Sequence, residues 1–199
     1  MIYLASNSPR RRELLQQIHV HFEPLLFRGP GRHDHDMAED VLPGEDAVTY
    51  VQRVANAKAV GGIQRMRWRE LPPRLLLAAD TTLELDGDIV GKPEDGEHAV
   101  AVLRRLSGRT HRVLTAVVLS DGERYASRLS TSEVRFRALS EGEVRDYVAT
   151  GEAADKAGAY GIQGRAALFI EEILGSYTGI MGLPLFETGA LLQEFGYSL

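Results

Sequence analysis

The start of the chain constrains the fold most strongly, because a buried strand, a polar turn and a helix follow one another there. Residues 2–4 are a short apolar run, which is typical of a buried strand. Ser8 stands at the N-cap position of the next segment, and Pro9 stands at the first helical position, where a missing N–H costs nothing. We therefore expect a strand, a tight turn and a helix over residues 2–15.

The charge at the start of this predicted helix is unusual. Arg10, Arg11 and Arg12 place three positive charges at the end that already carries the positive pole of the helix dipole. Two other predicted helix starts, after Pro93 and after Ser140, carry acidic residues instead. We interpret the hydroxyls of Ser6 and Ser8, the guanidinium groups and the helix N-terminus as an anion site, best suited to phosphate. The alternative is a solvated arginine run.

Composition excludes several classes of function. The 199 residues carry a formal net charge of -5, which argues against general binding to nucleic acid or to a membrane surface. The chain contains no cysteine, so disulfides and thiolate metal sites are excluded. No long apolar run and no signal peptide pattern is present, and we expect a cytoplasmic protein without a membrane segment.

A second candidate site follows the apolar segment at residues 74–79, which is typical of a strand buried on both faces. We expect this strand to end at Asp80, and a carboxylate at the end of a central strand lies where open α/β sheets bind ligands. An ordinary strand-terminating aspartate is the alternative. Residues 83–90 predict a hairpin that folds Lys92 back towards Asp80, so both charges are expected at one rim.

Two further loops have ambiguous signals. The loop after a strand predicted at residues 21–27 contains His33, Asp34, His35 and Asp36, which could hold a metal, although a solvated Gly/Pro loop is the favoured interpretation. The glycine-rich segment 155–164 either lets backbone approach a ligand closely or forms a tight turn. The remaining pattern predicts helices at 45–65, 99–106, 140–150 and 183–195, and strands at 111–119, 124–137 and 169–174.

Five ordered motifs carry a resemblance that spans nearly the whole chain: LASNSPRR (4–11), ADT (79–81), GKP (91–93), SGRTH (107–111) and DKAGAYGIQG (155–164). Together they resemble the Maf family of nucleoside triphosphate pyrophosphatases. The resemblance implies one domain over residues 1–199, with a mixed twisted α/β sheet, flanking helices and two lobes around a cleft. It also implies a divalent metal (Mg, Mn or Co), a homodimer, and cleavage of a nucleotide to the monophosphate and pyrophosphate.

The resemblance also implies roles for particular residues. YGIQG (160–164) and GIMGLP (179–184) resemble the branch that acts on dTTP and UTP, rather than the branch that prefers 7-methyl-GTP. Carried onto this chain, the general base is Asp80, and the residues that determine substrate specificity are Arg10, Thr81 and Gln163. The loop at residues 28–44 departs from the family pattern, because it is longer and lacks an acidic pair directly after the second strand. Asp34, Asp36 or Glu39 could replace that pair.

We therefore hypothesise metal-assisted attack of water between the α- and β-phosphates. Asp80 would hold the metal and activate the water. Residues that would bind the phosphates are Ser6, Ser8, Arg10, Arg11, Lys58 and Lys92. No cysteine and no nucleophile elbow is present, so water is the simplest nucleophile. Two rival hypotheses are a nucleotide-binding regulator of cell division or septum formation without catalysis, and a phosphatase that releases orthophosphate.

Overall fold

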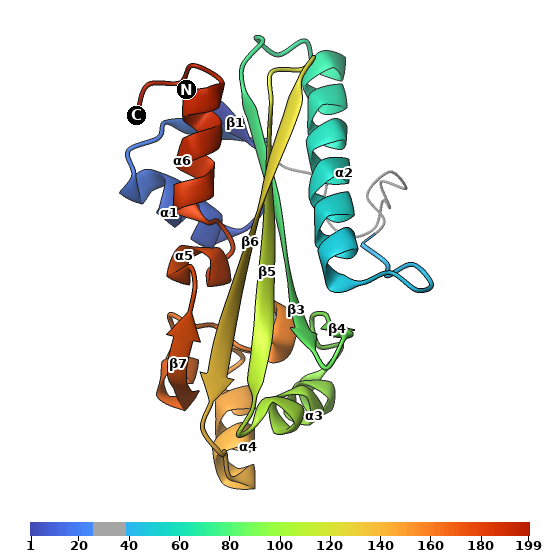
Figure 1. Ribbon diagram of the computed structural model, residues 1–199, viewed down its shortest axis with the longest axis vertical. Helices are drawn as coiled ribbons and strands as arrows, with labels where there is room; N and C mark the ends of the chain where they lie inside the picture. Colours follow the sequence, from blue (N-terminus) through green and yellow to red (C-terminus); the bar gives the residue numbers. More distant parts are fainter. Residues whose placement is uncertain (26–38) are drawn as a thin grey trace.

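The computed structural model describes residues 1–25 and 39–199, and it has a mixed α/β fold (Figure 1). In the described residues, seven strands form one sheet with the order β2-β1-β3-β5-β6-β7, and β4 pairs with β3 beside this path. The strands are β1 (Ile2–Leu4), β2 (Phe22–Pro24), β3 (Leu76–Leu85), β4 (Asp88–Val90), β5 (Thr110–Ser120), β6 (Tyr125–Phe136) and β7 (Ile170–Leu174). The helices are α1 (Pro9–Gln17), α2 (Ala47–Trp68), α3 (Gly96–Leu106), α4 (Glu141–Ala149), α5 (Tyr177–Ile180) and α6 (Leu185–Glu194).

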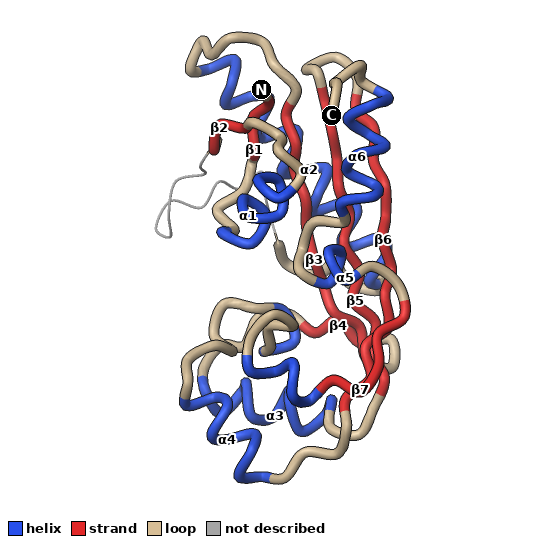
Figure 2. The backbone as a smooth tube through the Cα atoms, turned by 90° about the vertical axis from the view of Figure 1, so that its left-hand side faces the viewer, coloured by secondary structure: helices blue, strands red, loops and turns tan. Residues whose placement is uncertain are grey.

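Three long strands, β3, β5 and β6, run through two lobes (Figures 1 and 2). In one lobe, α2 covers one face of the sheet, while α1 and α6 cover the other; α3 and α4 belong to the second lobe. Side chains alternate between the faces of a strand, so Leu76 and Ala78 pack in the α2 core, while Leu77 and Ala79 pack with α1 and α6. The predicted mixed α/β fold with two lobes is confirmed.

Within residues 1–25 and 39–199, one edge of β3 is paired only at its two ends. Near its start, Leu77 is paired with Leu4 of the parallel strand β1, and near its end Leu83 is paired with Val90 of the antiparallel strand β4. The opposite edge is paired with β5 from Leu76 through Glu84. Residues 78–82 therefore face a gap between two short strands. This gap leaves room for side chains and ligands at the middle of the sheet.

The prediction that the strand ends at Asp80 was wrong. β3 continues to Leu85, because its pairing with β5 is uninterrupted across Asp80. The carboxylate is reachable for a different reason, namely the gap in the neighbouring edge. Asp80 can therefore be reached although it lies in the middle of a strand.

Most elements with strong local signals form as expected. Helix α4 begins with the predicted capping box, in which Ser140 accepts from the backbone of Glu143 and Glu143 accepts from the backbone of Ser140. Both predicted hairpins, β3-β4 and β5-β6, are confirmed.

Helix α5 was not predicted. The predicted loop residues His33, Asp34, His35 and Asp36 lie outside the described residues. None of the described helices combines the length and the apolar character that crossing a membrane requires.

Candidate active site

A cavity of about 660 Å³ lies beside the gap in β3, between the two lobes. Its walls come from the turn after β1, the start of α1, the middle of β3, and loops of the second lobe. The structure brings to this cavity every residue that the sequence singled out for the site: Ser6, Ser8, Arg10, Arg11, Lys58, Asp80, Thr81, Lys92 and Gln163.

An ion-pair cluster joins α2 to β3 inside the cavity. The Nζ atom of Lys58 lies 2.7 Å from Oδ1 of Asp80 and 2.7 Å from Oε1 of Glu39. Burial opposes ionisation of Glu39, but the charge and hydrogen bond of Lys58 outweigh it and hold the pKa of Glu39 below its usual range. Among the three acidic residues that the sequence left open, Glu39 lies in the cavity, while Asp34 and Asp36 lie outside the described residues.

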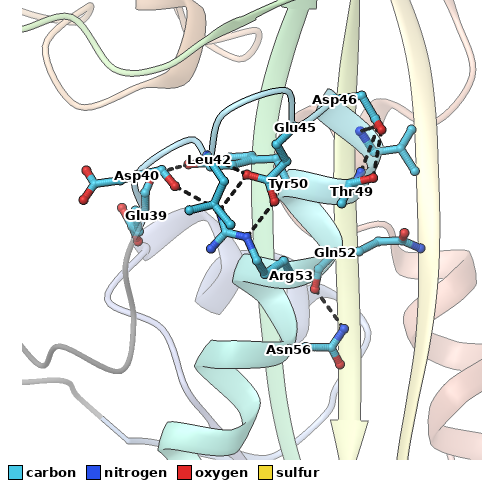
Figure 3. Close-up of polar contacts among 11 residues, drawn as sticks. Glu39, Asp40, Leu42, Glu45, Asp46, Thr49, Tyr50, Gln52, Arg53 and Asn56 are labelled. Atoms are coloured by element: carbon cyan, nitrogen blue, oxygen red, sulfur yellow. Dashed lines mark hydrogen bonds and ion pairs between the residues drawn. The ribbon is translucent and has the colours of Figure 1, made fainter.

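The backbone that carries Glu39 is anchored to the start of α2 (Figure 3). The hydroxyl of Tyr50 donates to the carbonyl of Glu39 at 2.8 Å, and Nη2 of Arg53 donates to the carbonyl of Asp40 at 2.9 Å. Burial, followed by the charges of Asp80 and Glu39, raises the pKa of Tyr50 to about 12, so this hydroxyl stays a donor. These contacts place the Glu39 carboxylate near Lys58.

Arg11 is held in the cavity wall entirely by neutral acceptors. Its Nε donates to the carbonyl of Gly182 at 2.7 Å, Nη1 to Oγ of Ser6 at 3.2 Å, and Nη2 to Oγ1 of Thr81 at 3.2 Å. Burial lowers the pKa of Arg11. In the described part of the chain, no carboxylate lies within ion-pair distance of it. A half-buried positive charge whose described hydrogen-bond partners are all neutral favours binding of an anion.

The Thr81 hydroxyl belongs to a directed chain of hydrogen bonds. Thr115 donates its only hydroxyl proton to the carbonyl of Gly179 at 2.8 Å, and the Oγ1 atoms of Thr81 and Thr115 lie 2.9 Å apart. Thr81 must therefore donate to Thr115, and it accepts from Arg11. In this arrangement Thr81 offers a ligand an oxygen lone pair and no proton.

Charged residues that the sequence did not single out complete the rim. Asp155 lies with its Oδ2 atom 3.8 Å from Nη1 of Arg10 and its Oδ1 atom 2.6 Å from Nζ of Lys156. The Gly158 amide donates to the Gly91 carbonyl at 3.1 Å and so ties this loop to the loop of Lys92. Although the whole chain is acidic, cations exceed anions among the lining residues: Arg10, Arg11, Lys58, Lys92 and Lys156 against Glu39, Asp80 and Asp155.

The cavity lining also includes apolar residues. These are Leu83, Val113, Tyr160 and Ile162, and the exposed Gln163 follows Ile162 in the chain. The Tyr160 hydroxyl lies 2.8 Å from Nε2 of His111. A cavity lined by cationic groups, apolar side chains and one amide matches a ligand with an anionic tail and a flat heterocycle.

The acidic residues of the cavity fit a divalent cation bound together with its substrate. No cluster of three or more His, Cys, Asp or Glu side chains that could hold a metal is found in the described ranges. Asp80 and Glu39 nevertheless bring two carboxylates to one lysine, and Asp80 Oδ2 accepts no hydrogen bond from a described residue. One or two carboxylates completed by phosphate oxygens is the donor set that Mg²⁺ commonly uses.

Comparison with known proteins finds relatives over the whole chain. The chain is 66% identical over 199 residues to the dTTP/UTP pyrophosphatase of Aromatoleum aromaticum, covering 100% of this chain and 97% of that protein. It is 55% identical to the dTTP/UTP pyrophosphatase of Dechloromonas aromatica, covering 98% of each. Among solved structures, that of the Staphylococcus aureus Ham1 protein is similar, with a TM-score of 0.47 and 14% identity over 98% of this chain and 96% of that chain.

The model of one protein family, described as Maf-like protein, matches residues 1–195. The match includes all of the predicted cavity residues from Ser6 to Gln163. This chain belongs to the Maf family.

Proposed function

We propose that this protein is a nucleoside triphosphate pyrophosphatase that hydrolyses dTTP and UTP to the monophosphate and pyrophosphate. The observation that carries the proposal is the cavity itself, which is lined by the Asp80–Lys58 pair, the half-buried Arg11 and the exposed Gln163. Relatives that are 66% and 55% identical over almost their whole length carry the name dTTP/UTP pyrophosphatase.

The triphosphate binds at the start of α1. Arg11 supplies a positive charge that has no anionic partner among the described residues, and the hydroxyls of Ser6 and Ser8 and the helix N-terminus lie beside it. Lys92 approaches from the second lobe, so phosphate binding involves both lobes. Phosphate relieves the unfavourable interaction between the arginines and the helix dipole.

Asp80 is the proposed general base. Lys58 holds one carboxylate oxygen at 2.7 Å and fixes its orientation, while the other oxygen is left to accept a proton from water. Lys58 also stabilises negative charge that develops on the phosphates. Asp80 and Glu39 are the residues that would hold a divalent cation, which when bound lowers the pKa of water and neutralises phosphate charge.

Gln163 is the proposed base-recognising residue. Uracil and thymine present a 4-keto acceptor beside an N3–H donor, and one amide matches both groups. Cytosine reverses this edge, so it would leave polar groups unpaired unless the amide flipped. Arg10 and Thr81 are the further specificity residues of this proposal, Thr81 through the lone pair that its hydrogen bonds leave free.

A substrate panel tests the proposal. We expect kcat/KM for dTTP and UTP to exceed that for CTP by roughly tenfold to a hundredfold, with ATP and GTP poor substrates. Gln163→Glu removes the amide donors and should reduce this preference. Equal hydrolysis of CTP and UTP by the unmodified protein contradicts the proposed base recognition. Tight binding of UTP without turnover, with a divalent metal present, would instead favour a nucleotide-binding regulator.

A further inference from the structure

A hydrogen-bond network lies behind the loop that carries Gln163. It is built from Tyr147 on α4 and Glu152 in the turn that follows α4, and neither residue lines the cavity. The Tyr147 side chain is buried, with 1% exposure. Its hydroxyl donates to Oε1 of Glu152 at 2.9 Å. Burial raises the pKa of Tyr147, so the hydroxyl keeps the proton that it donates.

The network binds the backbone on both sides of Gln163. The amide of Gly161 donates to the Tyr147 hydroxyl at 3.2 Å, and the amide of Arg165 donates to Oε2 of Glu152 at 3.1 Å. These two amides lie two residues before and two residues after Gln163. The Tyr147–Glu152 pair therefore fixes both ends of the short segment that presents the amide side chain.

The glycines of this segment make room for the network. A Cβ atom at Gly164 would lie 2.0 Å from Oε1 of Glu152, and one at Gly161 would lie 2.9 Å from Cε of Lys156. The Lys156 ammonium in turn donates to the Glu152 carbonyl at 2.7 Å. The sequence left two interpretations of the glycine-rich segment, close approach to a ligand or a tight turn. Close approach is observed at Gly161 and Gly164, but the groups approached are side chains of this protein.

We propose that Tyr147 and Glu152 are positioning residues for base selection, which act by holding the Gln163 loop in the conformation that recognises a 4-keto pyrimidine. The inference rests on the proposed function, in which Gln163 recognises the base. Tyr147 and Glu152 do not line the cavity, and their described hydrogen bonds do not reach Asp80 or Lys58, so they should affect the choice between bases more than the chemistry at the phosphates.

Two substitutions separate the parts of the network. Tyr147→Phe keeps the buried ring but leaves the Gly161 amide without its acceptor and Oε1 of Glu152 without its donor, while Oε2 still accepts from the Arg165 amide. Glu152→Gln keeps the shape and an acceptor for Arg165, but its amide nitrogen would face a hydroxyl that is already a donor. Asp146→Asn is the matched control. Asp146 is an exposed residue on α4, and its substitution removes the same charge as Glu152→Gln.

The experiment is a double-mutant cycle on base selectivity, measured as the ratio of kcat/KM for UTP to that for CTP. The variants are Gln163→Ala, Tyr147→Phe and their combination, with Glu152→Gln as the second route and thermal unfolding to establish that each variant is folded. We expect Tyr147→Phe and Glu152→Gln each to lower the ratio roughly threefold to tenfold, while kcat for UTP changes by less than about twofold. In the Gln163→Ala background, Tyr147→Phe should have no further effect on the ratio.

Each outcome has a distinct meaning. If Gln163→Ala lowers the ratio while Tyr147→Phe and Glu152→Gln do not, or if their effects add to it, the positioning role is overturned and the proposed function stands. A parallel fall of kcat for UTP and CTP with an unchanged ratio indicates a merely structural role and also overturns the inference. If Gln163→Ala keeps the wild-type ratio, the base-recognising role proposed for Gln163 fails, and this inference fails with it.

Discussion

At the scale of single residues, the site depends on one lysine that contacts two carboxylates. Lys58 lies within ion-pair distance of Asp80 and Glu39, and against the effect of burial its charge and hydrogen bond help to hold the pKa of Glu39 below its usual range. Their negative charges would otherwise repel each other and the substrate. The ammonium thus allows acidic and phosphate groups to share one cavity.

Substitution of Asp80 tests its role as the base. We predict that Asp80→Asn lowers kcat by about 10²–10⁴-fold, because the amide keeps the shape of the side chain but cannot accept a proton. Steady-state kinetics with UTP measure the loss, and the thermal midpoint should stay close to that of Asp146→Asn, which removes the same charge from an exposed site. Turnover at the wild-type rate would remove Asp80 from the mechanism.

The buried His111 should make the protein sensitive to acid. Burial lowers the pKa of His111 from 6.5 to about 4, so between these values the unfolded chain binds a proton that the folded protein does not. The free energy of unfolding therefore decreases as the pH falls through this range. The decrease is about 2 kcal/mol at a pH of roughly 5.

Urea unfolding at about pH 7 and about pH 5 measures this loss. His111→Gln cannot titrate, so it should lose about 2 kcal/mol less than the wild type over this range, although it starts less stable because Gln fits the aromatic site poorly. Equal losses in both proteins would mean that folding does not lower the pKa of His111.

At the scale of elements, helix α1 has no acidic residue in its first turn, whereas α3 and α4 do. The sequence predicted this contrast because it depends only on local residues. Ser8 occupies the N-cap position as expected, but its side chain makes no capping hydrogen bond. The helix N-terminus is thus left available for a ligand.

Pyrophosphate should stabilise the protein through α1. At 100 times its dissociation constant, a ligand that binds only the folded state adds about 2.7 kcal/mol. We predict that pyrophosphate raises the thermal midpoint of the wild type, and that Arg11→Ala loses most of this increase. Arg12→Ala is the matched control, because Arg12 follows on the same helix but does not line the cavity. An undiminished increase in Arg11→Ala would show that Arg11 is structural.

Local signals were enough to predict most elements, but not the features that depend on distant parts of the chain. Caps, a helix-starting proline and Asp-Gly turns located α1, α4 and both hairpins. The sequence did not show that β3 passes through Asp80, because that is decided by pairing with β5. The sequence could not show that Glu39 lies in the cavity, because the contacts that anchor this backbone come from Tyr50 and Arg53, further along the chain.

At the scale of the whole molecule, the cavity exists because one edge of a long strand is left unpaired between two lobes. Strand β3 carries Asp80 on the face towards α2 and Thr81 on the face towards α1, and the gap in its edge lets both side chains reach one cavity. The second lobe adds the apolar wall and Gln163. Residues of both lobes thus line one cavity around this strand.

The products formed from UTP test the central claim most directly. Phosphorus NMR of the wild type with UTP and Mg²⁺ distinguishes pyrophosphate from orthophosphate as they form. The account predicts UMP and pyrophosphate in equal amounts, no UDP, and loss of both products in Asp80→Asn. Release of UDP and orthophosphate, or formation of pyrophosphate at the wild-type rate by Asp80→Asn, would contradict it.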